Sequence, residues 1–143
     1  MSTNAFLGSG ATLAAGDTGS AANFVAISEI RTLSGPSADN PTVEVTHLGS
    51  SSAEFVSGLA SQGAINCTAN FDPSSGSHFT AAKGILGEFT NKTVRYWRIT
   101  WNDTGSTTAT FQAFVSSRSI ETPPNGAVEL SFDLTITGPV TWA

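Results

Sequence analysis

The chain has 143 residues and a mass of 14.7 kDa, which fits one domain. Six Lys and Arg residues oppose eleven Asp and Glu residues, so the formal net charge is -5 and the pI is about 4.7. This acidity argues against a nucleic-acid-binding protein, which needs a basic surface to displace the counterions of phosphates. The single cysteine, Cys67, excludes an internal disulfide and any metal site built from several cysteines.

Two observations concern the compartment. No stretch approaches the roughly 20 apolar residues that a transmembrane helix needs. The first cation is Arg31, so the N-terminus lacks the basic region of a signal peptide. We therefore expect a protein that resides in a reducing cytoplasm.

The first 22 residues consist mainly of Ala, Gly, Ser and Thr, with few large apolar residues. This composition predicts an N-terminal arm over residues 1–22 that is ordered only where something docks on it. Residues 23–143 are then a single β domain. Its first strand runs over residues 23–33 with a bend midway, and it ends at Pro36 because proline cannot donate a hydrogen bond to a sheet.

Residues 34–63 form an unusually long connection that is rich in Ser and Gly. Such a loop inside a compact domain is usually functional or disordered. This one also carries large apolar residues that a disordered linker would lack, namely Leu48, Phe55, Val56 and Leu59. We expect the loop to be mobile in the free subunit and to become ordered against a partner, with these four residues as assembly contacts.

Two segments alternate between apolar and polar residues, as half-buried strands do. In the first, over residues 65–71, the apolar row begins at Ile65; in the second, over residues 128–137, it begins at Val128. The polar rows opposite them are Asn66, Thr68, Asn70, Glu129, Ser131, Asp133 and Thr135. Alternation alone does not distinguish an ordinary solvent face from the wall of a lumen.

The apolar residues Ala82, Ile85, Leu86 and Phe89 follow helical spacing. They predict one amphipathic helix over about residues 77–90, and the segments after it read as strands and turns. The expected fold class is therefore mainly β: an antiparallel sandwich or barrel with one flanking helix, a long inter-strand loop and a flexible N-terminal arm.

Two copies of Asp-Thr-Gly-Ser, beginning at Asp17 and Asp103, suggest the paired carboxylates of an aspartic protease. The context argues against this interpretation, because such loops lie between apolar strands, whereas small residues flank the first copy. The second copy lies where a hairpin needs a turn, and Asp, Thr and Gly are common turn residues. We therefore expect both copies to be turn or coil.

No other group of residues predicts chemistry. His47 and His78 are not paired in sequence with any nucleophile, and two isolated histidines do not make a metal site. Cys67 lies on the apolar side of a predicted strand and is expected in the core. The sequence thus predicts no enzyme activity, no cofactor and no metal.

Several segments resemble the major tail tube proteins of long, non-contractile-tailed bacteriophages. They are Thr46-His47-Leu48-Gly49-Ser50, the run from Glu54 to Gly63, and Asn70-Phe71-Asp72-Pro73. The order of arm, strand, long loop, strand, helix and final strands is also similar, over roughly residues 5 to 140. The chain departs from some members in ending without an extra immunoglobulin-like domain.

This resemblance implies a β-sandwich that assembles as hexameric rings stacked into a hollow tube, through which DNA passes without specific binding. It also implies as partners other copies of the same chain and the tape measure, tail tip and tail terminator proteins. The location would be the virion tail, after assembly in the host cytoplasm. The seven polar residues of the two alternating rows would face the lumen.

Two alternatives stay open at this point. One is a ring protein of a type VI secretion tube, which has the same general fold. The other is an aspartic protease built on the two Asp-Thr-Gly-Ser copies. Gel filtration with negative-stain imaging would distinguish the three. A tail tube protein should form long tubes, a secretion ring protein single rings, and a protease a compact monomer or dimer.

Overall fold

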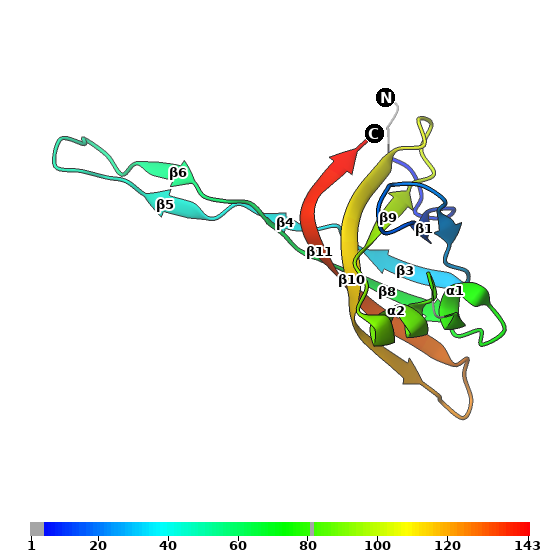
Figure 1. Ribbon diagram of the computed structural model, residues 1–143. Helices are drawn as coiled ribbons and strands as arrows, with labels where there is room; N and C mark the ends of the chain where they lie inside the picture. The colour runs from blue at the N-terminus through cyan, green and yellow to red at the C-terminus, as the bar shows by residue number, and fades with distance from the viewer. Residues whose placement is uncertain (1–4, 81) are drawn as a thin grey trace.

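The computed structural model describes residues 5–80 and 82–143. Seven of its strands are β1 (Thr12–Ala15), β2 (Val25–Ala26), β3 (Ile30–Ser34), β8 (Ala64–Asn70), β9 (Arg95–Thr100), β10 (Thr108–Glu121) and β11 (Glu129–Trp142). They form one antiparallel sheet in the order β2-β1-β9-β10-β11-β8-β3. The sheet curls into a half-barrel (Figure 1), so the expected mainly β, antiparallel fold is confirmed.

The curl follows from the connection between the two outermost strands. β2 and β3 lie at opposite edges of the sheet, yet only Ile27, Ser28 and Glu29 separate them along the chain. The sheet can satisfy this connection only by curling until its edges approach each other. Ile27 is buried where the two edges approach each other, and its backbone N–H donates to the Leu13 carbonyl at 2.8 Å.

The hydrophobic core fills the inside of the curl. The four apolar residues of β11 that alternate inward, Leu130, Phe132, Leu134 and Ile136, are all buried. Trp97 on β9 is buried as well, and its indole N–H donates to the Ala113 carbonyl at 3.1 Å, so its polar atom has a partner. The period-2 pattern therefore identified the inward face of these strands correctly.

The predicted arm over residues 1–22 is wrong for part of its length. Residues 1–4 lie outside the described residues, but Thr12–Ala15 is strand β1, which pairs with β9 on one side and β2 on the other. Leu13 and Ala15 are fully buried. The Ala-rich composition concealed this strand, because alanine has low β propensity.

The predicted single helix over residues 77–90 is also wrong, because two short helices take its place: α1 (Gly76–Phe79) and α2 (Ile85–Asn91). The helix is broken because the backbone is extended at Thr80, which follows α1, and at Gly84, which precedes α2. Glycine fits at position 84, because a Cβ there would lie 2.4 Å from the Thr80 carbonyl oxygen. Ile85 is buried as expected, whereas Ala82 is exposed. No helix in the described part of the chain is long and apolar enough to cross a membrane.

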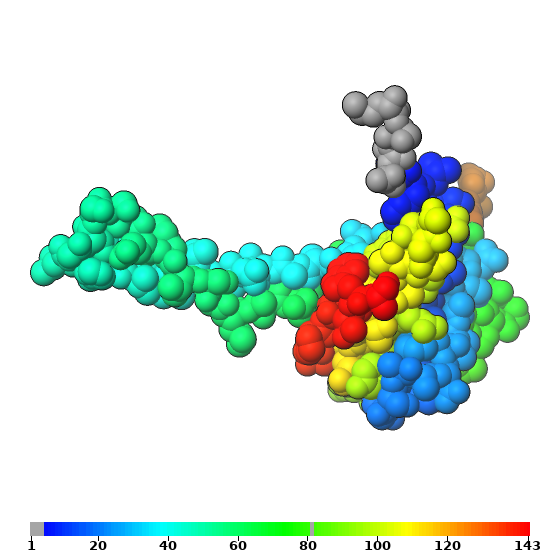
Figure 2. Space-filling view, turned by 90° about the horizontal axis from the view of Figure 1, so that it is seen from above, coloured from blue at the N-terminus to red at the C-terminus, as the bar shows by residue number. Residues whose placement is uncertain are grey.

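Residues 34–63 are regular rather than a loop. After Ser34 ends β3, the chain runs out and back as a β-hairpin in which β4 (Ala38–Asp39) pairs with β7 (Ser61–Gln62) and β5 (Thr42–Glu44) pairs with β6 (Phe55–Ser57). We call residues 35–63 the hairpin arm. The arm projects far from the curled sheet, and the view from above shows it standing clear of the body (Figures 1 and 2).

Replacing Leu13 tests the correction to the N-terminal segment. Leu13→Ala should lower the free energy of unfolding by about 2–5 kcal/mol, because it removes a fully buried side chain from the core. Leu7→Ala is the matched control, since Leu7 is 79% exposed and its replacement should change stability little. Urea denaturation followed by tryptophan fluorescence measures both. Equal stability of the two variants would show that residues 12–15 do not belong to the sheet.

Candidate functional site

The outer face of the curled sheet gathers the polar residues predicted from the two alternating rows. β8 and β11 are neighbours, and their register places the rows directly opposite each other. The cross-strand pairs are Asn66 with Asp133, Thr68 with Ser131, and Asn70 with Glu129. Thr135 continues the β11 row opposite Ala64. The structure therefore brings all seven residues onto one continuous surface, which we call the polar face.

The polar face is wider than the sequence predicted. β10 has an irregularity between Val115 and Ser117, after which its residues change sides. Ser117, Ser119 and Glu121 consequently lie opposite Asp133, Ser131 and Glu129, and they extend the polar face. A period-2 pattern does not reveal such a shift, because the alternation restarts without any change in composition.

Few charges lie on the polar face, and some are compensated. Arg31 forms an ion pair with Glu129. Asp133 accepts a hydrogen bond from the Ser117 hydroxyl at 2.8 Å. Most of this surface therefore presents hydroxyl and amide groups, with Asp133 as an acidic side chain in its centre.

The hairpin arm exposes the four apolar residues that were predicted to make assembly contacts. Leu48 and Leu59 are almost fully exposed, and Phe55 and Val56 are about half exposed. Val43 and Val45 add to this apolar surface and were not predicted from the sequence. Val43 pairs with Val56 across the hairpin, whereas Glu44 pairs with Phe55, so the arm has an aliphatic face and a face with an aromatic ring beside a carboxylate.

The tip of the arm is held together by local polar contacts. The Glu54 backbone N–H donates to the Thr46 hydroxyl at 2.8 Å, and the Ser50 hydroxyl donates to the Glu54 carboxylate at 2.5 Å. His47 accepts a bond from the Gly49 N–H at 3.0 Å and lies 3.6 Å from the Glu54 carboxylate. His47 is thus a turn residue of the arm.

The two Asp-Thr-Gly-Ser copies are turns at opposite ends of β9. The Asp17 carbonyl accepts from the N–H of Tyr96 near the start of β9, whereas Asp103 follows the end of this strand. Six extended residues span about 20 Å, so the two carboxylates cannot share a proton as a protease dyad does.

Each of these carboxylates has its own partners. The Asn23 amide and Lys83 lower the pKa of Asp17 below its usual value, through a hydrogen bond of 2.7 Å and an ion pair of 3.2 Å. The side chain and backbone of Thr107 lower the pKa of Asp103, with bonds of 2.6 and 2.7 Å. Both carboxyl groups are therefore ionised at neutral pH, and each stabilises the local structure around it.

The remaining titratable candidates are structural as well. His78 is fully buried; its Nδ1 accepts from the Asp72 N–H at 3.1 Å, and its Nε2 lies 2.7 Å from the Ser28 carbonyl, to which it donates. Cys67 is buried in the core, and this burial raises the pKa of its thiol to about 12. The residues that the structure describes contain no group of three potential metal ligands.

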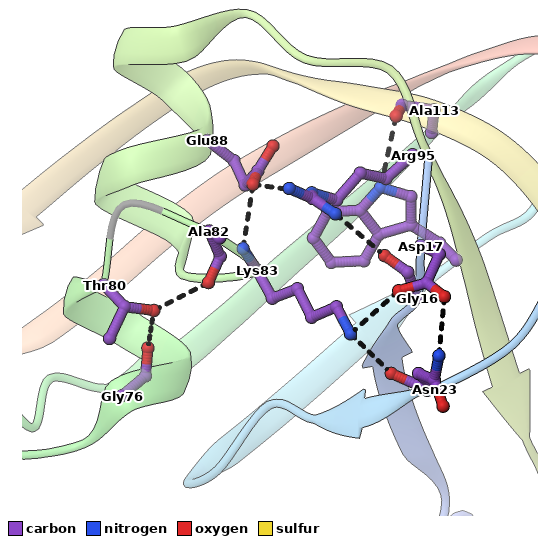
Figure 3. A network of polar contacts seen from close by, with 11 residues as sticks. Gly16, Asp17, Asn23, Gly76, Thr80, Ala82, Lys83, Glu88, Arg95 and Ala113 are labelled. Carbon is purple, nitrogen blue, oxygen red and sulfur yellow. Dashed lines mark hydrogen bonds and ion pairs between the residues drawn. The ribbon is translucent and has the colours of Figure 1, made fainter. Parts of the chain in front are cut away.

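One buried ion pair was not predicted from the sequence. Glu88 on α2 is buried, and Arg95 on β9 donates to its carboxylate at 2.6 Å (Figure 3). The same oxygen accepts the Lys83 backbone N–H at 2.8 Å, and Lys83 reaches Asp17 through its side chain. This network fastens α2 and the segment before it to β9 and to the turn after β1. A lone Glu on a helix gives no sequence signal for such a role.

Asp103→Asn tests the structural role of this carboxylate. Because its folded pKa lies below the unfolded value of about 3.8, the ionised form stabilises the fold above about pH 4, and this contribution is lost as the pH falls through the folded pKa. The variant should therefore be less stable than the wild type at pH 7, and the difference should vanish in acid. Denaturation at several pH values measures this, with Asp39→Asn on the arm as control. A difference that does not change with pH would contradict it.

Comparisons with known proteins bear on this fold. No protein-family model matches the chain, and no curated protein matches it. Among solved structures, a chain from the tail of an empty gene transfer agent particle, determined with C6 symmetry, has a TM-score of 0.78 at 18% identity. The match covers 97% of this chain and 99% of that one.

Two further structures extend the likeness. The SPP1 tail tube has a TM-score of 0.73 at 14% identity, covering 96% of this chain and 78% of the other. A type six secretion system protein has a TM-score of 0.57 at 12% identity, covering 92% and 81%. At these identities the similarity is one of fold. The expected likeness to tail tube proteins is therefore confirmed at the level of the fold, and the type six secretion system protein has a similar fold.

Proposed function

We propose that this protein is the structural subunit of a phage tail tube. Copies assemble as hexameric rings, and the rings stack into a hollow tube that conducts DNA from a virion with a long, non-contractile tail. The fold supports this proposal, since the likeness to a chain in a tail with C6 symmetry extends over nearly the whole length of both. The type six secretion system protein is less similar, which favours a tail over a secretion tube.

The hairpin arm carries the proposal most directly. About a dozen residues lead out along the arm and as many lead back, and at roughly 3.3 Å each they give a length near 40 Å, whereas a body of this size has a radius of gyration of about 13 Å. The arm contributes no residue to the hydrophobic core. A long projection with exposed Leu48, Phe55, Val56 and Leu59 is unfavourable in a free monomer, and it is explained if these residues contact a subunit of the next ring.

In this proposal the polar face forms the wall of the lumen. A heterologous contact repeated around a ring closes into a tube, and one face of each sheet then points inward. A wall of hydroxyl, amide and acidic groups offers few cations to DNA phosphates, so a duplex slides without being held. We assign Asn66, Thr68, Asn70, Glu129, Ser131, Asp133 and Thr135 to this wall.

The proposed role is structural rather than catalytic, and it requires no cofactor. Its partners are other copies of the chain along the tube. At the two ends and inside the tube we propose the tail tip, tail terminator and tape measure proteins. The protein would assemble in the host cytoplasm and function in the virion tail.

Phe55→Ser tests the role of the arm. The substitution removes an apolar contact of roughly 1.5–3 kcal/mol per subunit, repeated around every ring, and should abolish tubes. The circular dichroism of the subunit should stay unchanged, because the arm lies outside the core. Sedimentation and negative-stain images of purified protein measure assembly, with Phe55→Leu as the conservative control. Normal tubes from Phe55→Ser, or a collapsed fold, would show that the arm is not an assembly element.

Asp133→Lys tests the lumen assignment; Glu129 is less suitable, because Arg31 compensates its charge. Tubes should still form, since no apolar contact is lost, but they should retain DNA at low salt and release it as salt rises. Asp39→Lys places the same charge change on the arm and should not retain DNA. Fluorescent DNA that co-sediments with tubes is the measurement. Equal retention by the two variants would place Asp133 outside the lumen.

A further inference from the structure

A groove lies beside the middle of β10, between the end of α2 and a side of this strand with which no strand pairs. The last residue of β9 to pair with β10 is Arg95, opposite Ala113, and within the described residues no strand pairs with this side of β10 from Phe114 onward. The groove has a volume of about 430 Å³ and is lined by Phe89, Lys92, Val94, Phe114, Val115 and Ser116. An open strand edge beside an apolar groove is the arrangement that accepts an extended segment from another chain.

Two cations border the groove. Lys92 lies in its wall, and the Arg118 guanidinium lies 5.2 Å from the centre of the Phe89 ring. Three other cations, Arg31, Lys83 and Arg95, pair with carboxylates. In the part of the chain that the structure describes, no carboxylate forms an ion pair with Lys92 or Arg118. The groove therefore fits a segment that presents an apolar side chain together with an acid.

The hairpin arm of the same protein presents this combination. Residues 35–63 contain Asp39, Glu44 and Glu54 but no Lys or Arg. Glu44 lies directly opposite Phe55 in the pairing of β5 and β6, so the ring and the carboxylate are side by side on one face of the arm. Phe55 is 57% exposed, and its ring has the size and character to contact Phe89 and Phe114.

The register of the sheet favours docking between two copies. Ala64, where the arm returns to the sheet, pairs with Thr135, and Thr135 pairs with Phe114 at the groove. The arm and the groove thus flank opposite sides of the β10–β11 pair. Two complementary surfaces on opposite sides of one subunit form a head-to-tail contact, which propagates from copy to copy.

We propose that this groove receives the hairpin arm of a second copy, with Phe55 inserted between Phe89 and Phe114 and with Glu44 facing Lys92 and Arg118. The proposal rests on the proposed tube and names the surface to which the arm binds. The outer edge of the arm then lies along the open edge of β10 as an added strand. The contact buries apolar side chains and pairs opposite charges, so the arm binds this surface of the neighbouring copy in preference to others.

Cross-linking in assembled tubes tests this contact. A variant with Glu44→Cys and Lys92→Cys should give a ladder of covalent multimers with a short bis-maleimide reagent. The control variant combines Glu44→Cys with Thr104→Cys, an exposed position in the turn after β9, and should stay monomeric on a denaturing gel. The native Cys67 should not react, because it is buried and its raised pKa of about 12 leaves almost no thiolate.

Charge reversal provides a second, independent test. Arg118→Glu should raise the protein concentration needed for assembly by at least about tenfold, since it places two acids together, and adding Glu44→Arg should reverse the effect. The groove assignment would be overturned if tubes form but the Glu44→Cys, Lys92→Cys variant gives no cross-linked multimers, or if Glu44→Arg does not reverse the effect of Arg118→Glu. Either result would leave the proposed tube function unaffected. A wild-type protein that forms no tubes would overturn the proposed function itself, and the inference with it.

Discussion

The connection between β2 and β3 is the constraint on which the rest of the structure depends. Three residues link the two outermost strands of a seven-stranded sheet, so the sheet has to curl until its edges meet. One face then becomes an enclosed core, and the other faces outward over its whole width. The polar face, the open strand edges and the hairpin arm that leaves the sheet after β3 consequently stay exposed in the free chain.

The sequence predicted the faces of the sheet better than its boundaries. Alternation in β8 and β11 identified inward Phe132 and outward Asp133, because the side chains of a strand change sides at each residue. It did not identify the irregularity near Ser116, which adds part of β10 to the polar face. The ion pair of Arg31 with Glu129 depends on register between distant strands, and no local pattern encodes it.

The errors have local causes. Two of the four residues of β1 are alanines, so this strand resembled coil. α1 and α2 resembled one helix because apolar residues at helical spacing do not reveal the extended backbone at Thr80 and Gly84. The hairpin arm resembled a loop since its pairing is interrupted and its composition is that of turns. Its four apolar residues were nevertheless the feature that pointed to assembly, and the structure exposes all of them.

The stability of the arm links these surfaces to assembly. A two-stranded hairpin without a sheet or helix to pack on is marginally stable in water. The arm has few contacts beyond its own two strands, so in the proposed contact part of its order would come from the surface it binds. In the proposed groove an open edge of β10 would supply a third strand, and Phe89 and Phe114 would supply an apolar base. Binding would then order the arm, and the entropy lost in ordering it would set a threshold concentration below which subunits stay apart. In the proposed contact, strand pairing, insertion of the Phe55 ring and opposite charge would all be required at once, and this would keep the apolar arm from associating with other surfaces.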